Sequence, residues 1–152
     1  MPLFDATFTK PTGETDFDGL QQYGPSIQVS VGHYVPQGAT IATPTSPETT
    51  WALIDTGAAE SCIDSELAQR LGLPVIDKMI ISGSNGSHTH DVYLAHINIF
   101  GLEFSQFGRF AGVHLADGQQ PHGVLLGRTF LRAVMLIYDG IRGQITLSSP
   151  RY

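Results

Sequence analysis

The segment Ala52-Leu53-Ile54-Asp55-Thr56-Gly57-Ala58 decides how this sequence is interpreted. Trp51 to Ile54 is a short apolar run, typical of a buried strand, and it leads directly into Asp55. Gly57 permits the tight turn that must follow. A carboxylate at the end of a buried strand needs an explanation, because apolar surroundings disfavour its charged form. One explanation is structural: a turn aspartate can accept a hydrogen bond from the backbone that follows it.

Two later segments complete a pattern around this one. Gly123-Val124-Leu125-Leu126-Gly127 reads as a second buried strand, and Arg128 to Ala133 as a short helix after it. Between the two buried strands, Lys78 to Ile81 and Asp91 to Ile99 predict a pair of strands. They are joined by Ser82-Gly83-Ser84-Asn85-Gly86-Ser87, whose Asn-Gly pair is a strong hairpin signal.

In this order and spacing the motifs resemble the retropepsin family, the retroviral-type aspartic peptidases. In that family an apolar strand ends in an Asp-Thr-Gly loop, and a later apolar strand ending in Gly packs beside it before a short helix. The resemblance runs from about Ile27 to Leu147 and suits a cellular or bacterial single-domain member. It implies an all-β fold: a closed acid-protease barrel with one or two short helices and a flap hairpin.

The resemblance also implies an activity, aspartic endopeptidase, with Asp55, Thr56 and Gly57 as the catalytic triplet. Two carboxylates held close together share one proton, so that one can activate water while the other protonates the peptide. Asp139-Gly140 lacks the Thr, and Asp117-Gly118 lies in a polar stretch, so one chain supplies one triplet. We therefore expect a homodimer that presents Asp55 twice, with the Thr56 hydroxyls bonding across it, and no metal or cofactor.

Other residues take their expected roles from the same resemblance. Gly127 and Arg128 are expected to be structural. The residues expected to contact an extended polypeptide substrate come from the Asp55 loop, the flap tip and the second strand. They are Ala58, Ala59, Cys62, Ser82, Gly83, Ser84, Asn85, Gly86 and Leu126.

The sequence departs from the family directly after the Asp55 loop. Retroviral enzymes usually place acidic residues there, where they contact substrate backbone and pair with the arginine of the later Gly-Arg motif. Here Ala59 takes the first of those positions and Glu60 the next. Arg128 is expected either to pair with Glu60 or to face solvent.

Three further features have competing readings. His88 and His90, two apart on a strand and followed by Asp91, could hold a metal ion, or they could be polar flap residues. Asn85-Gly86-Ser87 matches a glycosylation sequon but is expected to be a turn. Cys62 has no recognisable His partner and is expected to be a small wall residue of the cleft.

The remaining elements follow from periodicity and breakers. Ser26 to Val31 alternates with Ile27, Val29 and Val31 inward, and Pro36 to Thr50 reads as an exposed loop. A helix should begin at Asp64 or Ser65, present Leu67, Ala68 and Leu71, and end before Gly72 and Pro74. Val134 to Tyr138 and Gln144 to Leu147 should be strands, and either could build a sheet across the dimer.

The bulk properties set the outer limits. The 152 residues suit one domain, divided as a 1–25 leader, a 26–148 peptidase domain and a 149–152 tail. A net charge of −6 argues against a nucleic-acid partner. No long apolar run or basic leader suggests a membrane or secretion, so a cytoplasmic protein is expected. The rival functions are a non-catalytic dimerisation or peptide-binding module and a His-based metal hydrolase.

Overall fold

The computed structural model describes residues 3–5, 17–35, 38, 46–100, 102 and 104–149. The strands are β1 (Leu3–Asp5), β2 (Ser26–Gly32), β3 (Glu48–Ile54), β4 (Cys62–Asp64), β5 (Val75–Gly83), β6 (Gly86–Ile99), β7 (Phe104–Val113), β8 (His122–Leu126), β9 (Met135–Asp139) and β10 (Gln144–Ser148). The helices are α1 (Phe17–Tyr23), α2 (Ser65–Arg70) and α3 (Arg128–Leu131), with one 3-10 turn, η1 (Ala116–Gly118).

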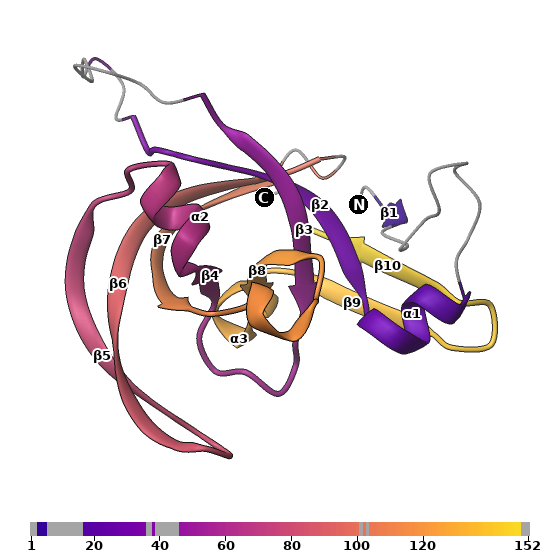
Figure 1. Ribbon diagram of the computed structural model, residues 1–152. Coiled ribbons are helices and arrows are strands. Elements are labelled where there is room, and N and C mark those ends of the chain that lie inside the picture. Colours follow the sequence, from indigo (N-terminus) through magenta and orange to yellow (C-terminus); the bar gives the residue numbers. More distant parts are fainter. Residues whose placement is uncertain are drawn as a thin grey trace.

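Six strands close into a barrel. The hydrogen-bonded order is β2-β3-β8-β4-β7-β6, and the last part of β6 pairs back onto β2. Strand β5 lies outside the closure and pairs with the first part of β6, on the edge opposite β7. Closure removes the free edges that an open sheet would present. The expected all-β closed barrel is confirmed (Figure 1).

The pairing of β3 with β8 positions the two motifs. These strands are parallel, with Ile54 opposite Leu126. Parallel neighbours have their carboxyl ends at the same end of the sheet. The two segments that follow β3 and β8 therefore lie side by side, namely Asp55-Thr56-Gly57 and Gly127-Arg128. Residues about 70 positions apart in the chain thus share one end of the barrel.

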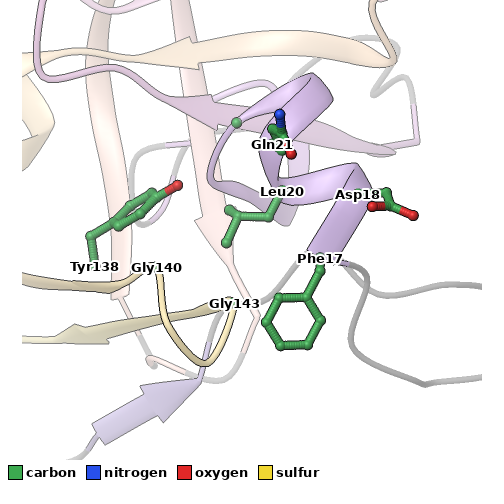
Figure 2. Close-up of a pocket in the computed structure, with 8 residues that line it drawn as sticks. Phe17, Asp18, Leu20, Gln21, Tyr138, Gly140 and Gly143 are labelled. Atoms are coloured by element: carbon green, nitrogen blue, oxygen red, sulfur yellow. The ribbon is translucent and has the colours of Figure 1, made fainter.

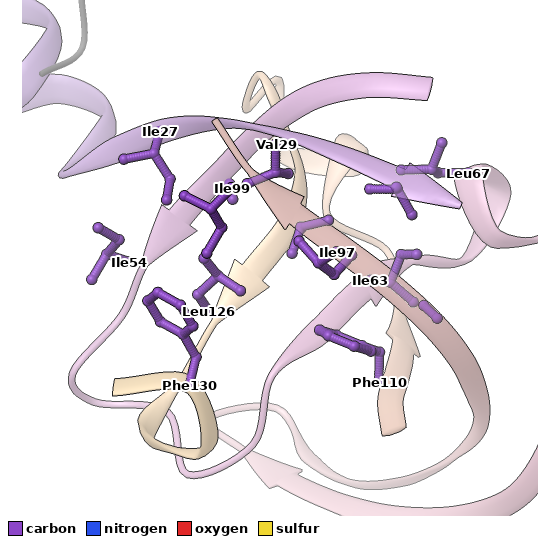
Figure 3. Close-up of a cluster of buried hydrophobic side chains, with 14 of the residues drawn as sticks. Ile27, Val29, Ile54, Ile63, Leu67, Ile97, Ile99, Phe110, Leu126 and Phe130 are labelled. Atoms are coloured by element: carbon purple, nitrogen blue, oxygen red, sulfur yellow. The ribbon is translucent and has the colours of Figure 1, made fainter. Parts of the chain in front are cut away.

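The core consists mainly of aliphatic side chains, with Phe110 and Phe130 among them (Figure 3). Tyr93 belongs to the same cluster. Ile27, Val29 and Val31 of β2 are at most 2% exposed, while Gln28 between them is exposed, so the expected inward face is confirmed. Phe110 and Phe130 are fully buried in the same cluster. Asp55 therefore follows a strand whose Ala52 and Ile54 belong to the core.

Helix α2 begins and ends as its sequence predicts. Asp64 is the N-cap, and its Oδ2 accepts a hydrogen bond from the Leu67 amide at 3.2 Å. Gly72, with a φ of 64°, follows the last turn. The other oxygen of Asp64 accepts from the amides of Leu115 and Ala116, so the same carboxylate also anchors the segment after β7.

The flap hairpin is formed by β5 and β6, which Figure 1 shows as a long arm reaching past the end of the barrel. Gly83 pairs with Gly86, so Ser84 and Asn85 form the turn, one residue earlier than an Asn-Gly turn. Gly86 has a φ of 101°, a conformation that favours glycine. The expected tip, from Gly83 to Gly86, is confirmed.

A second sheet, in the order β1-β10-β9, lies beside the barrel together with α1. Both α1 and β1 fall within the expected leader, and Leu20 of α1 is only 4% exposed within the core cluster. With α2 and α3, helix α1 gives the described residues three short helices, in keeping with the expected mostly-β fold. Because this helix contributes to the core, we propose that the domain begins before Phe17.

The expected loop from Pro36 to Thr50 needs correction. Glu48 to Thr50 belong to β3, paired with β2, so the expected loop ends before them, while Ser46 and Pro47 are exposed. Most of the loop, residues 36–37 and 39–45, lies outside the described residues. Strands β4 and β7 were not expected.

No helix of the described chain has the length and apolar character needed to cross a membrane.

Candidate active site

The Asp55 loop is held from within and from β8. The Asp55 amide donates to the Leu126 carbonyl at 3.0 Å, which continues the β3–β8 pairing by one residue. The Oδ1 atom of the Asp55 side chain accepts a hydrogen bond from the Gly57 amide at 2.8 Å. This is the local hydrogen bond of a turn aspartate, and it fixes the direction of the carboxylate. Asp55 is half-buried, whereas Thr56 and Gly57 are exposed at the end of the barrel.

The segment after β8 clamps this loop through backbone contacts. The amides of Arg128 and Thr129 donate to the carbonyls of Ala58 and Ala59 at 2.9 and 3.2 Å. A Cβ atom on Gly127 would lie 2.4 Å from the Glu60 carbonyl oxygen, so only glycine allows this approach. The structural role expected for Gly127 thus has a steric basis.

Of the two expectations for Arg128, pairing with Glu60 is wrong, whereas exposure to solvent is confirmed, with an added backbone contact. Its side chain is exposed, yet Nη1 donates to the carbonyls of Thr56, at 2.9 Å, and Gly57, at 3.0 Å. No ion pair with Glu60 is found among the described residues. With Ala59 in the place of an acid, the guanidinium binds the backbone of the loop.

A pair of hydroxyl groups completes the clamp, and sequence reasoning missed it. Ser61 is 1% exposed, and its Oγ accepts from the Gly127 amide at 3.1 Å and lies 2.9 Å from Thr129 Oγ1. Thr129 Oγ1 also accepts from the Ser61 amide. Their positions in the sequence could have indicated this contact, because Ser61 and Thr129 lie next to the two motifs that were expected to meet.

A cavity of about 430 Å³ opens between the Asp55 loop and β5. Its walls are mainly apolar, with one acidic and one basic residue. They are formed by Gly57, Ala58, Ala59, Glu60, Cys62, Met79, Ile80, Ile81, Ser82 and Arg128. The loop and the hairpin therefore face a common space.

The expected substrate-contact residues divide into three groups. Ala58, Ala59, Cys62 and Ser82 line the cavity. Residues 83–86 are exposed at the hairpin tip beyond it. Leu126 is a correction: its side chain is fully buried in the core, because alternation along β8 turns it inward. The walls formed by Met79, Ile80 and Ile81 were not expected, although their apolar run beside the hairpin turn could have indicated them.

Cys62 is buried in the cavity wall, 9% exposed. Burial, followed by the negative charges of Glu60 and Asp55, raises the pKa of its thiol to about 11. A thiol at that pKa carries almost no thiolate at neutral pH and is a poor nucleophile.

The remaining candidates have structural surroundings. His90 Nδ1 donates to the Gly112 carbonyl at 2.8 Å, while His88 is exposed on the hairpin. Within the described ranges, no three His, Cys, Asp or Glu side chains are grouped to hold a metal ion. Asp139 accepts from the amides of Ile141 and Arg142 in the turn after β9, and these contacts, with that of the Arg142 side chain, lower its pKa.

A second cavity, of about 460 Å³, lies between α1 and the β9–β10 turn (Figure 2). Phe17, Leu20 and Tyr138 form its apolar part, and Asp18 and Gln21 its polar part. Its walls include no residue of the Asp55 loop.

The chain is similar to one protein family and to solved structures. The family model described as "Aspartyl protease" matches residues 45–130, a span that contains both the Asp55 loop and the Gly127-Arg128 segment. Among solved structures, the chain is similar to the solution structure of simian foamy virus (mac) protease, with 14% identity and a TM-score of 0.45. The match covers 70% of this chain and 91% of that one. No curated protein gives a significant match.

Proposed function

The chain belongs to the aspartyl protease family, with a retropepsin-like fold, and from that premise we propose that it is an aspartic endopeptidase active as a homodimer. The proposed reaction is hydrolysis of a peptide bond by water held between the Asp55 carboxylates of two identical chains. It requires no metal or cofactor.

The chemistry follows from bringing two carboxylates together. At hydrogen-bonding distance both cannot be ionised, so the pair shares one proton and titrates as a unit. The ionised carboxylate takes a proton from water as the water attacks the peptide carbonyl. The protonated one donates to the peptide, and the leaving nitrogen is then protonated as the bond breaks.

The observation that best supports the proposal is the fixed and accessible Asp55 loop. Its carboxylate is oriented by the Gly57 amide, and its backbone is anchored to Leu126 and Arg128. Thr56 and Gly57 are exposed beside it, so a second copy of the loop can approach. A turn aspartate with only a local role would not require so many contacts from a distant segment.

The second sheet offers a surface for the second chain. In the described sheet β10 is paired on both sides, by β1 and by β9, whereas β9 pairs with β10 alone. Met135 and Ile137 of β9 are 42% and 47% exposed. An unpaired edge with apolar side chains is a site for adding a strand, and two copies of β9 related by a twofold axis would pair antiparallel. We therefore favour β9 over β10 as the strand that pairs across the dimer.

Sedimentation combined with a cleavage assay on an unfolded protein tests the dimer. Activity per chain should fall as the chain is diluted through its dimer dissociation constant, because a monomer carries one carboxylate of the pair. Ile137→Lys should raise the dimer dissociation constant, so that the loss of activity begins at a higher protein concentration. The matched control is Ile141→Lys, which places the same charge in the turn after β9, where Ile141 is 94% exposed.

Three outcomes would contradict this proposal. Constant activity per chain on dilution, with a monomer seen by sedimentation, would exclude the shared site. A stable dimer that binds peptides and cleaves none of them would favour the non-catalytic module, and loss of cleavage with a chelator would favour a metal hydrolase.

A further inference from the structure

Three features of the cavity beside the Asp55 loop bear on which peptides it can accept. Met79 and Ile81 on β5 face it from the flap side, and Ala58 and Cys62 from the barrel side. The small alanine leaves space, and the cavity volume of about 430 Å³ falls within the range of natural ligand sites. An apolar side chain of an extended peptide fits such a space.

The second feature is an acid at the wall without a partner. Glu60 is exposed, and among the described residues no hydrogen bond or ion pair is found for its carboxylate. Arg128 also lines the cavity, but its Nη1 is held by the carbonyls of Thr56 and Gly57. Arg128 is the one cationic residue among those that line this cavity, and it binds the loop backbone and not Glu60, whose carboxylate is left available for a ligand.

The third feature is the field inside the cavity. Burial is the main cause of the raised pKa of the Cys62 thiol in the wall, and the negative charges of Glu60 and Asp55 raise that pKa further, so both charges act at the cavity wall. The chain as a whole carries a net charge of −6. A cationic side chain entering the cavity is attracted by this field, and an anionic one is repelled.

We propose that this site selects peptides in which a large apolar residue lies close to a lysine or arginine, and that the carboxylate of Glu60 is the group that recognises the basic side chain. This inference rests on the proposed function, because it assigns a substrate class to the same site. A homodimer contains Glu60 twice, so the preference applies on both sides of the cleaved bond.

A peptide series measures this selectivity. Each peptide keeps one leucine or phenylalanine at the cleaved bond and carries Lys, Gln or Glu at one flanking position at a time, and kcat/KM is determined for each. At one position on each side, Lys should exceed Gln by about two- to fivefold, the range for an exposed ion pair, with Glu below both. The preference should shrink in high salt.

Variants then assign the preference to one residue. Glu60→Gln should bring the Lys-to-Gln ratio close to one, and Glu60→Lys should reverse it in favour of Glu. Glu66→Gln, on the exposed face of α2, removes the same charge elsewhere and should keep the wild-type ratio. Thermal unfolding of each variant confirms that the fold is retained.

The outcomes separate the two proposals. A wild-type enzyme that cleaves with equal kcat/KM for Lys, Gln and Glu at every position overturns the selectivity and leaves the peptidase intact. A preference that persists in Glu60→Gln also overturns it. If the wild type cleaves no peptide under any condition, the proposed function fails and this inference fails with it.

Discussion

Arg128 Nη1 donates a hydrogen bond to the backbone carbonyl of Thr56 at 2.9 Å, across 72 positions of sequence. The same nitrogen reaches the carbonyl of Gly57 at 3.0 Å. A cation thereby holds the two residues that follow Asp55, and it does so from outside the loop. We assign Arg128 a positioning role, since it binds the backbone of the loop.

The first prediction concerns this contact. Arg128→Ala should lower kcat/KM by about 3- to 10-fold, as expected for losing hydrogen bonds of about 1 kcal/mol that orient the loop. Arg128→Lys should recover little, because an ammonium cannot reproduce the planar guanidinium. Arg132→Ala, an exposed arginine of the same helical turn, is the control. Equal kcat/KM for Arg128→Ala and wild type would exclude the positioning role.

The second prediction concerns pH and stability. His122 is 4% exposed, and its Nε2 lies 2.7 Å from the Oγ of Ser26, which itself donates to the Gly24 carbonyl. Because Ser26 has one hydroxyl proton, Nε2 is the donor to it. Burial lowers the pKa of His122 below 6.5. The unfolded chain then binds the proton more readily, so stability is fully present above pH 6.5 and is lost as the pH falls below it.

Urea unfolding at pH 7.5, 6.5 and 5.5 checks this dependence. The free energy of unfolding should decrease from pH 7.5 to pH 5.5. This decrease should be smaller in His122→Gln, which lacks the titrating imidazole. The variant should also cost about 1–3 kcal/mol at pH 7.5, as for other disrupted buried hydrogen bonds. An identical pH dependence in both proteins would show that His122 does not carry it.

Cys62 gives the third prediction. With the pKa of its thiol at about 11, two units above the ordinary 9.0, alkylation by iodoacetamide at pH 7.5 should be about 100-fold slower than in the urea-unfolded chain. Mass spectrometry of the labelled peptide follows the rate. Equally rapid labelling of folded and unfolded protein would contradict both the burial and the raised pKa.

The elements that the sequence made predictable are those with strong local signals. The Asp64 cap and the Gly72 stop defined α2, and alternation from Ile27 to Val31 defined β2. The two motif segments could be placed together because the family resemblance pairs their strands. In each case the local pattern and the tertiary environment agree.

The missed elements depend on tertiary contacts. Burial alternates along β7 from Phe104 to Phe110, but the sequence does not, because its phenylalanines recur every third residue and Gly108 lies among them. Only pairing with β6 and β4 makes it a strand. Helix α1 is short, and its one fully buried large residue is Leu20. Leu126 was misassigned because a continuous apolar run does not reveal which side chains turn inward. The role of Arg128 likewise depends on carbonyl positions that no sequence pattern encodes.

The fourth prediction concerns the flap. Residues 82–87 are exposed and contain two glycines, whereas Met79, Ile80 and Ile81 line the cavity below them. The tip should therefore open readily in the free protein and become protected when a ligand fills the cavity. Hydrogen exchange with and without a bound peptidomimetic inhibitor should show slower exchange at residues 80–90. If their exchange is unchanged while the site is occupied, the hairpin is not a lid.

In the proposed mechanism, the Asp55 carboxylates of the two chains activate the water that cleaves the peptide. The most direct measurement is kcat/KM on an unfolded protein substrate, at several pH values, for the wild type and for Asp55→Asn. The amide replaces the carboxylate at nearly constant volume, so dimer and fold should be retained by sedimentation and thermal unfolding. Asp55→Asn should lower cleavage by at least about 1,000-fold at every pH, as for loss of an essential catalytic group. Cleavage by the purified variant at a rate close to that of the wild type would contradict this mechanism.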